Sequence, residues 1–163
     1  MSKKSAIAIL NKQYREIDKN PIEGIYIGIK NDNILTWEGT LMGPENTMYD
    51  EGIFKFEMIF PDSYPLFPPK FIFTTPIFHP NIYGNGIVCI SILHNPGEDE
   101  MGYERADERW RPVHTVESII LSIISLLSNP NDESPANITA GKLWRENKDE
   151  YKKEVKKCVR LSQ

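Results

Sequence analysis

The alternation of side chains between residues 53 and 60 constrains the fold of this 163-residue chain more than any other feature. Every second position of the segment IFKFEMIF carries a bulky apolar side chain, namely Phe54, Phe56, Met58 and Phe60. Successive side chains of a β-strand point to opposite faces, so this set is predicted to cover the buried face of a sheet.

Similar segments, rich in β-branched and aromatic residues, occur at residues 25–29, 35–42 and 70–74. The turn-forming sequences KNDN, GPEN and PDSYP separate the four segments. Strands that follow one another through short loops predict an antiparallel, four-stranded meander.

Helical patterns flank the predicted sheet. Near the N-terminus, apolar residues recur at helical spacing: Ile7, Leu10, Tyr14 and Ile17. This stripe predicts a helix over residues 3–19, ended by Asn20-Pro21. After an irregular stretch at 75–112, three more helices are predicted at residues 116–128, 138–144 and 148–161. The first of these is apolar almost all round and is expected to be buried. The chain is thus predicted to be one α+β domain, residues 1–163.

Composition restricts the function classes. The chain is 40% hydrophobic and 26% charged, as in soluble globular proteins. Its net charge of −4 argues against a general nucleic-acid binder. The two cysteines are too far apart in sequence for a CxxC metal site, and reducing surroundings are the simpler interpretation. The start of the chain lacks the pattern of a signal peptide, and the most apolar run, residues 116–128, is too short to span a bilayer. We therefore expect a cytoplasmic protein with no membrane span.

The irregular stretch 75–112 contains FHPNIYGNGIVCISI, with one cysteine, Cys89, and one histidine, His79. A loop of this length inside a compact domain is usually functional. A free cysteine is nevertheless more often a small buried apolar residue than a nucleophile. The segment alone leaves both interpretations open.

The surrounding sequence resembles the ubiquitin-conjugating enzymes, the E2 class. YPLFPPK matches their Tyr-Pro-x-x-Pro-Pro turn, and HPN is followed by a cysteine eight positions after the asparagine. The motifs GPENTMYDEG, WRPVHTVESIILSI and NPNDESPAN occur in the order found in that family, so the resemblance covers nearly the whole chain. The insertion HNPGEDEMGYERADERW, which follows CISIL, resembles that of the G-type enzymes.

The resemblance implies a reaction and a set of partners. Cys89 would accept ubiquitin from an E1 enzyme as a thioester, and a lysine of a protein substrate or of ubiquitin would attack it with help from a RING-type E3 ligase. A thiol suits this task because it is both a strong nucleophile and a good leaving group. Transfer of an acyl group from a thioester to another thiol is nearly balanced and needs no strong base, and the sequence shows no evident Cys-His-Asp arrangement. ATP would be consumed by the E1, so no bound cofactor or metal is expected.

Three residues near Cys89 are candidates for supporting roles. Asn81 is expected either to donate a hydrogen bond to the oxyanion of the transition state or to brace its own loop. His79, beside Pro80, is expected to bind backbone groups through its ring nitrogens. His94 opens the insertion and is expected either to line the site and gate the access of lysine or to lie in solvent.

The insertion is strongly acidic. Between Gly97 and Arg109 it carries six acidic residues and two arginines, a net charge of −4. Such a run is often only a solvated loop. Close to Cys89 it would attract a lysine ammonium, and a carboxylate there would orient that lysine and receive its proton. Glu98 and Asp99 are the candidates for this role.

Two surfaces are implied by the resemblance. Leu66 and Pro112 would form an apolar patch for the RING domain of an E3, and Arg111 would affect which ligase binds. The basic face of the first helix would suit an acidic E1 surface, and its candidates are Lys3, Lys4, Lys12 and Arg15. An ordinary solvated face is the competing interpretation of these four residues.

Two other functions compete with the enzyme. One is a catalytically silent binding module of the same fold, although such variants generally lack the cysteine that this chain keeps. The other is a carrier of a different ubiquitin-like modifier, which the G-type insertion disfavours.

The family resemblance also implies that the ubiquitin chains built are of the type that signals proteasomal degradation. Recruitment to the endoplasmic reticulum surface by a partner, and presence in the nucleus, are left open.

Overall fold

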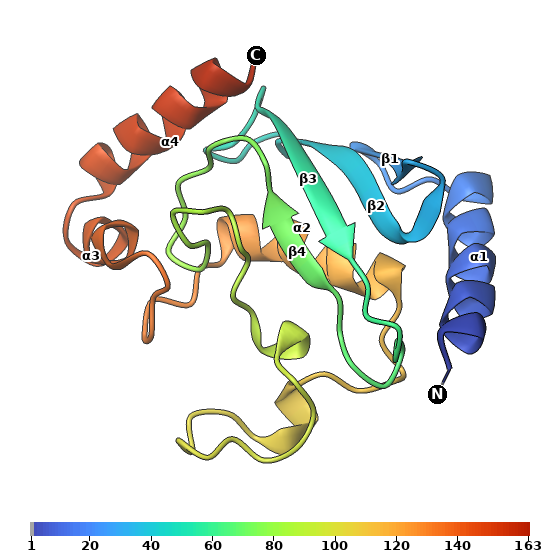
Figure 1. Cartoon of the computed structure of the whole chain (residues 1–163). Coiled ribbons are helices and arrows are strands. Elements are labelled where there is room, and N and C mark those ends of the chain that lie inside the picture. Colours follow the sequence, from blue (N-terminus) through green and yellow to red (C-terminus); the bar gives the residue numbers. More distant parts are fainter. Residues whose placement is uncertain (1) are drawn as a thin grey trace.

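The computed structural model describes residues 2–163, and Met1, the first residue of the predicted domain, lies outside them. The elements follow in the predicted order of one helix, four strands, a long irregular segment and three helices (Figure 1). The helices are α1 (Lys3–Lys19), α2 (Val116–Ser128), α3 (Ile138–Glu146) and α4 (Lys148–Ser162). The strands are β1 (Ile25–Lys30), β2 (Asn33–Met42), β3 (Ile53–Ile59) and β4 (Lys70–Phe73). The predicted α+β class is confirmed.

The strands form one antiparallel sheet in the order β1-β2-β3-β4, which is the predicted meander. The alternation in β3 has the predicted sense, because Phe54, Phe56 and Met58 are at most 1% exposed. Met58 pairs with Trp37 of β2 on one side and with Phe71 of β4 on the other. A row of large side chains across the sheet therefore forms the centre of the core.

The first hairpin is tighter than the sequence predicted. The turn was expected to include all of KNDN, but Lys30 and Asn33 pair across a loop of two residues. Asn31 and Asp32 have φ angles of 52° and 57°. Two-residue hairpin loops need this left-handed conformation, which Asn and Asp tolerate well. As a result β1 and β2 are each longer than predicted.

Helix α2 lies behind the sheet in Figure 1 and buries its apolar side. Thr115 and Ser118 form a capping box at its N-terminus, which satisfies backbone N–H groups that the helix leaves free. The side chains that it buries are Val116, Ile119, Ile120, Ile123 and Leu127. The helix was expected to be buried, and it is buried along one side only, because Leu121 on another side is 49% exposed.

The other helices lie at opposite ends of the sheet (Figure 1). On the α1 side, Tyr14 packs edge-on against Trp37, with 5.3 Å between ring centroids. On the α4 side, the hydroxyl of Tyr151 lies 2.9 Å from that of Tyr49. Tyr49 in turn donates a hydrogen bond to the carbonyl oxygen of Phe78 at 2.5 Å. The C-terminal helix is thus connected to the segment that precedes the HPN motif.

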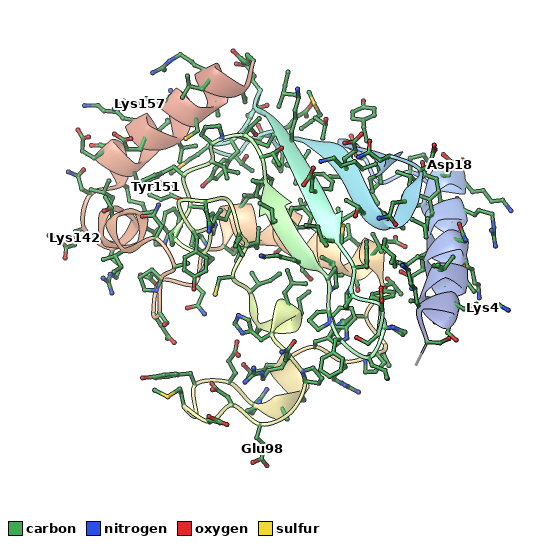
Figure 2. The ribbon with its side chains drawn as sticks, in the orientation of Figure 1. Lys4, Asp18, Glu98, Lys142, Tyr151 and Lys157 are labelled. Carbon is green, nitrogen blue, oxygen red and sulfur yellow. The ribbon has the colours of Figure 1, made fainter. Side chains whose placement is uncertain are left out.

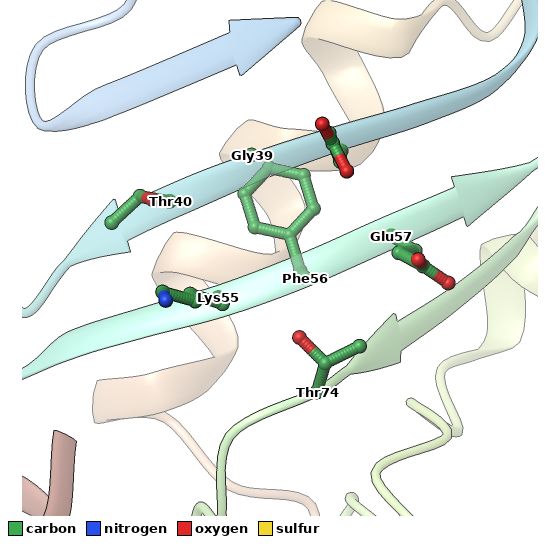
Figure 3. Close-up of a pocket in the computed structure, with 7 residues that line it drawn as sticks. Gly39, Thr40, Lys55, Phe56, Glu57 and Thr74 are labelled. Atoms are coloured by element: carbon green, nitrogen blue, oxygen red, sulfur yellow. The ribbon is translucent and has the colours of Figure 1, made fainter. Parts of the chain in front are cut away.

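A hollow of about 330 Å³ lies over β2 and β3 and is lined in part by Thr40, Lys55, Glu57 and Thr74 (Figure 3). Glu57, on this hollow, also forms an ion pair with Lys30 of β1. None of the residues that line it is a candidate from the sequence. The hollow is therefore separate from the site around Cys89.

Candidate active site

The segment after β4 turns back along that strand and brings Cys89 to the HPN motif. The N–H of Val88 donates to the carbonyl oxygen of Phe71 in β4 at 3.0 Å. The N–H of Cys89 donates to the carbonyl oxygen of Asn81 at 2.8 Å. The backbone of the cysteine is therefore fixed both to the sheet and to the asparagine that the sequence singled out.

Cys89 is half-buried and borders a cavity of about 370 Å³. Pro69, Tyr83, Leu93 and His94 are among the residues that line this cavity. Tyr83 is 45% exposed, and a charge on the Cys89 sulfur is the largest cause that raises the pKa of its hydroxyl. The thiol thus lies at a cavity rather than in the closed hydrophobic core.

Two consecutive hydrogen bonds, through His94, connect Cys89 to an acidic residue of the insertion. The Nε2 atom of His94 lies 3.5 Å from the Cys89 sulfur. The Nδ1 atom of the same ring lies 2.8 Å and 3.0 Å from the two carboxylate oxygens of Glu104. The sequence showed no evident Cys-His-Asp arrangement, whereas the structure connects Cys89, His94 and Glu104. Glu104 was missed because nothing in the sequence distinguishes it from the five other acids of the insertion.

These neighbours change the protonation of His94. Its pKa is raised to about 9, first by the hydrogen bond to the Cys89 sulfur and then by Glu104, against the opposing effect of burial. Of the two sequence alternatives for His94, the structure favours the one that lines the site. The imidazole lies between a thiol and a carboxylate, an arrangement that could carry a proton.

The other acids of the insertion have different positions. The Asp99 carboxylate accepts hydrogen bonds from the backbone N–H groups of Met101, Tyr103 and Glu104, each at 3.0 Å. The bond from Met101 is the largest cause that lowers the pKa of Asp99. Glu98 is exposed and points away from the body of the domain in Figure 2. No hydrogen bond or ion pair joins either candidate to Cys89 or His94.

Arg109 holds the two ends of the insertion together. Its Nε atom donates to the carbonyl oxygen of Asn95 at 2.9 Å. The same guanidinium lies 3.7 Å from Asp99 and 3.9 Å from Glu104. The sequence did not single out Arg109, although it is one of only two cations between residues 97 and 109. Its contacts help to fix Glu104 in the position from which it reaches His94.

His79 is fully buried, and both of its ring nitrogens bind backbone atoms. Nε2 lies 2.7 Å from the carbonyl oxygen of Leu126 in α2, and Nδ1 accepts from the N–H of Asn81 at 2.9 Å. Burial lowers the pKa of His79 to about 4, so the ring is neutral at physiological pH. These contacts are those that a supporting role requires. Pro80, also buried, contributes its carbonyl oxygen to the N–H of Asn137 at 3.0 Å.

Asn81 bridges to a loop 50 residues away. Its amide Nδ2 donates to the carbonyl oxygen of Asn131 at 2.7 Å, and its Oδ1 accepts from the N–H of Asn131 at 2.8 Å. The amide therefore braces the loop after α2 rather than only its own loop. An amide nitrogen has two N–H groups, and Asn131 accepts from one of them. The second N–H is available for an oxyanion, so the predicted oxyanion role and the bracing role are compatible.

The two expected docking surfaces are exposed. Leu66 is 39% exposed, and Pro112 and Arg111 are exposed beside Trp110, whose Nε1 donates to the carbonyl oxygen of Pro65 at 2.8 Å. The basic residues expected to face the E1 are exposed on α1: Lys3, Lys4, Lys12 and Arg15.

Within residues 2–163, no helix is long and apolar enough to cross a membrane. The same range contains no group of three or more acids, histidines and cysteines placed to bind a metal ion.

Known proteins provide an independent comparison. A family model described as ubiquitin-conjugating enzyme matches residues 9–159. Ubiquitin-conjugating enzyme E2 15 of Schizosaccharomyces pombe is 56% identical over 155 residues, which are 94% of this chain and 93% of that protein. Ubiquitin-conjugating enzyme E2 14 of Arabidopsis thaliana is 52% identical over 164 residues, 100% of this chain and 98% of that protein. Ubiquitin-conjugating enzyme E2 G2 of Homo sapiens is 49% identical over 159 residues, 97% and 96% of the two chains.

Proposed function

Since the chain belongs to the ubiquitin-conjugating enzymes and is an E2 of the G type, we propose that Cys89 is the residue that carries ubiquitin. The single observation that supports this most directly is the position of the thiol. It is the half-buried cysteine of the HPN segment and borders the cavity of about 370 Å³. The other cysteine, Cys158, packs against the core on α4, where burial raises the pKa of its thiol. Cys158 therefore lacks the surroundings of a nucleophile.

The proposed reaction has two acyl transfers. The E1 delivers the C-terminal carbonyl group of ubiquitin to the Cys89 sulfur as a thioester. A lysine amine of a substrate or of another ubiquitin then attacks that carbonyl carbon, and the sulfur leaves. Asn81 is proposed to stabilise the oxyanion with its second N–H, while its first holds the Asn131 loop. His79 and Pro80 hold the backbone of this motif in place.

The partners in this proposal are those of the family: ubiquitin, an E1, E3 ligases and protein substrates. A RING-type E3 would dock on the surface of Leu66, Arg111 and Pro112. The E1 would bind the basic face of α1 that carries Lys3, Lys4, Lys12 and Arg15. The E1 would consume the ATP, so the protein itself needs no bound cofactor. We propose a cytoplasmic site of action, including recruitment to the endoplasmic reticulum surface by a partner, and chains that signal degradation.

Loading of Cys89 by an E1 tests the proposed function. The protein is incubated with E1, ATP and ubiquitin, and the products are separated with and without reductant. The wild-type protein is expected to form an adduct of one ubiquitin that disappears under reductant, whereas Cys89→Ser should form none or a reductant-stable ester. Cys158→Ser is the matched control and should load like the wild type. A reducible adduct that survives in Cys89→Ser would refute the assignment, and absence of any wild-type adduct would refute the enzymatic function.

A further inference from the structure

We propose that His94, oriented by Glu104, is a second catalytic residue that carries a proton between the acceptor lysine nitrogen and the Cys89 sulfur. This proposal rests on the thioester function of Cys89 and specifies how protons move during it. It assigns the base to a histidine, whereas the sequence offered only carboxylates of the insertion for receiving the lysine proton. His94 takes the role of receiving the lysine proton, for which the sequence favoured Glu98 and Asp99, and Glu104 orients the ring.

The geometry supplies both contacts that a proton carrier needs. A carboxylate can only accept a hydrogen bond, so the Nδ1 atom that lies 2.8 Å and 3.0 Å from Glu104 carries the hydrogen. The other nitrogen, Nε2, therefore faces the reacting sulfur, at 3.5 Å. A distance of this size is common for catalytic contacts before the substrate is bound. His94 also lines the cavity beside Cys89, into which an acceptor lysine must extend.

The orientation of His94 is fixed from more than one side. The N–H of Trp110 donates to the His94 carbonyl oxygen at 3.0 Å, which holds the backbone of the histidine against the end of the insertion. Arg109, 3.9 Å from Glu104, keeps that carboxylate near the ring and also contacts Asp99. The remaining titratable group next to the sulfur is Tyr83. An imidazole held in this way does not need to reorganise when the substrate arrives, which is the condition for efficient proton transfer.

During loading, Nε2 of His94 holds the proton that belongs to the Cys89–His94 pair, in line with the raised pKa of the ring. The sulfur then attacks the thioester carbonyl of the E1-bound ubiquitin, and one carbon–sulfur bond forms while that of the E1 breaks. The departing E1 sulfur takes up the proton from His94. The step is balanced, because one thiol and one thioester are converted into another thiol and another thioester.

During discharge, the acceptor lysine attacks in its amine form. A carbon–nitrogen bond forms and the carbon–sulfur bond to Cys89 breaks. His94 takes one proton from the nitrogen at Nε2 and returns it to the departing sulfur, so that an amine and a thioester become an amide and a thiol. In the loaded enzyme the sulfur belongs to a thioester, and its hydrogen bond to His94, the largest cause that raises the pKa of this ring in the free enzyme, is weakened. Loading thus makes the neutral, proton-accepting form of the ring easier to populate.

A brace is the competing role for His94. In that case the ring would only anchor the insertion through Glu104, and its protonation would not matter to the rate. The two roles differ in their dependence on pH. The same acceptor amine reacts in every variant, so the ratio of wild-type to variant rates cancels the titration of the amine itself and reports on His94 alone.

The test measures discharge of preformed enzyme–ubiquitin thioester to free lysine between pH 6 and 9.5. Wild type is compared with His94→Gln, which keeps a hydrogen-bonding amide but cannot titrate, and with Glu104→Gln. Glu100→Gln, an exposed acid of the same insertion, is the matched control. The ratio of wild-type to His94→Gln rates is expected to rise with pH to about 100-fold, the size of a general-base effect. Because Glu104 raises the pKa of His94, Glu104→Gln should move the pH dependence of the rate to lower pH, while Glu100→Gln leaves it unchanged.

Each other outcome has a distinct meaning. A ratio that stays constant over the pH range, or that falls as pH rises, overturns the proton-carrier role while the function of Cys89 stands. Failure of the wild type to form a reducible adduct overturns the proposed function and this proposal together. If His94→Gln does not fold or load, His94→Gly decides the question. Added imidazole should then accelerate discharge by His94→Gly, and absence of this rescue would contradict the proposal.

Discussion

Acidification should destabilise this protein through one buried histidine, His79. The ring is fully buried, and in its neutral form it satisfies both neighbours, Leu126 with Nε2–H and Asn81 with Nδ1. A second proton on Nδ1 would remove the acceptor for the Asn81 N–H and place a positive charge in the core. The folded protein therefore resists a protonation that the unfolded chain accepts readily.

The size of the effect follows from the pKa of His79 in the two states. The value is about 4 in the folded protein, against 6.5 for an exposed histidine. The unfolded state binds more protons between these values, so stability rises with pH across this window and is lost as pH falls through it. At pH 4.5 the free energy of unfolding should be lower than at pH 7.5 by about 2.5 kcal/mol from this residue alone.

Urea denaturation at pH 7.5 and pH 4.5 measures the change, and a variant isolates it from the carboxylates that titrate in the same range. His79→Gln keeps an amide but has no titrating group. At pH 7.5 it should be less stable than the wild type by about 1–3 kcal/mol, because buried backbone groups lose a partner. At pH 4.5 most of this difference should disappear, because only the wild type carries the cost of protonation.

A difference between wild type and His79→Gln that is the same at both pH values would refute the reasoning. It would mean that the histidine is protonated to the same extent in the folded and unfolded states. Near-ultraviolet circular dichroism at each pH provides the control that both proteins start from the native fold. His94→Gln serves as a second control between pH 4.5 and 6.5, because the stability that His94 contributes changes only above pH 6.5.

Two further predictions concern the backbone around the site. Asn81→Ala should load ubiquitin nearly normally but discharge it to lysine about 100-fold more slowly, which corresponds to about 3 kcal/mol for one oxyanion donor; equal loss in loading and discharge rates would instead indicate only the brace to Asn131. Gly43→Ala should lower the free energy of unfolding by about 3 kcal/mol, because a Cβ atom there would lie 1.6 Å from the carbonyl oxygen of Tyr49. Gly84→Ala, where nothing lies within 4 Å, is the control and should change stability by less than about 1 kcal/mol in urea denaturation; similar losses in both variants would contradict the steric argument.

The sequence predicted the elements whose local signals agree with the tertiary structure. The bounds of α1 and α2 were predicted correctly, since a proline follows one helix and a capping threonine precedes the other. The four strands were also predicted, because alternation of burial in β3 follows directly from the two faces of a sheet. Two short 3-10 turns at Ser91–Leu93 and Ala106–Glu108 were missed. Elements of three residues have no periodicity from which a sequence pattern could be recognised.

Of the candidate active site, the sequence predicted only the residues that belong to one short motif. Cys89, His79 and Asn81 belong to one short segment, and the structure places them together. The bond between Asn81 and Asn131 spans 50 residues, and the bond between His94 and Glu104 depends on how an irregular insertion closes. Such contacts depend on the path of the backbone in three dimensions rather than on spacing along the chain. For the same reason the sequence did not identify Glu104 among six similar acids.

The two histidines near Cys89 show how environment assigns opposite properties to one residue type. Burial without a charged partner lowers the pKa of His79 to about 4, whereas the Cys89 sulfur and Glu104 raise that of His94 to about 9. Any stability that His94 contributes is fully present below pH 6.5. It is lost as pH rises toward about 9, the pKa of His94 in the folded protein. Loss of stability below pH 6.5 should therefore report on His79 and the scaffold that it holds. A discharge rate that depends on pH above 6.5 should report on proton transfer by His94. Because the two intervals do not overlap, one pH titration of stability and rate separates the residue that holds the motif from the residue that acts on the sulfur.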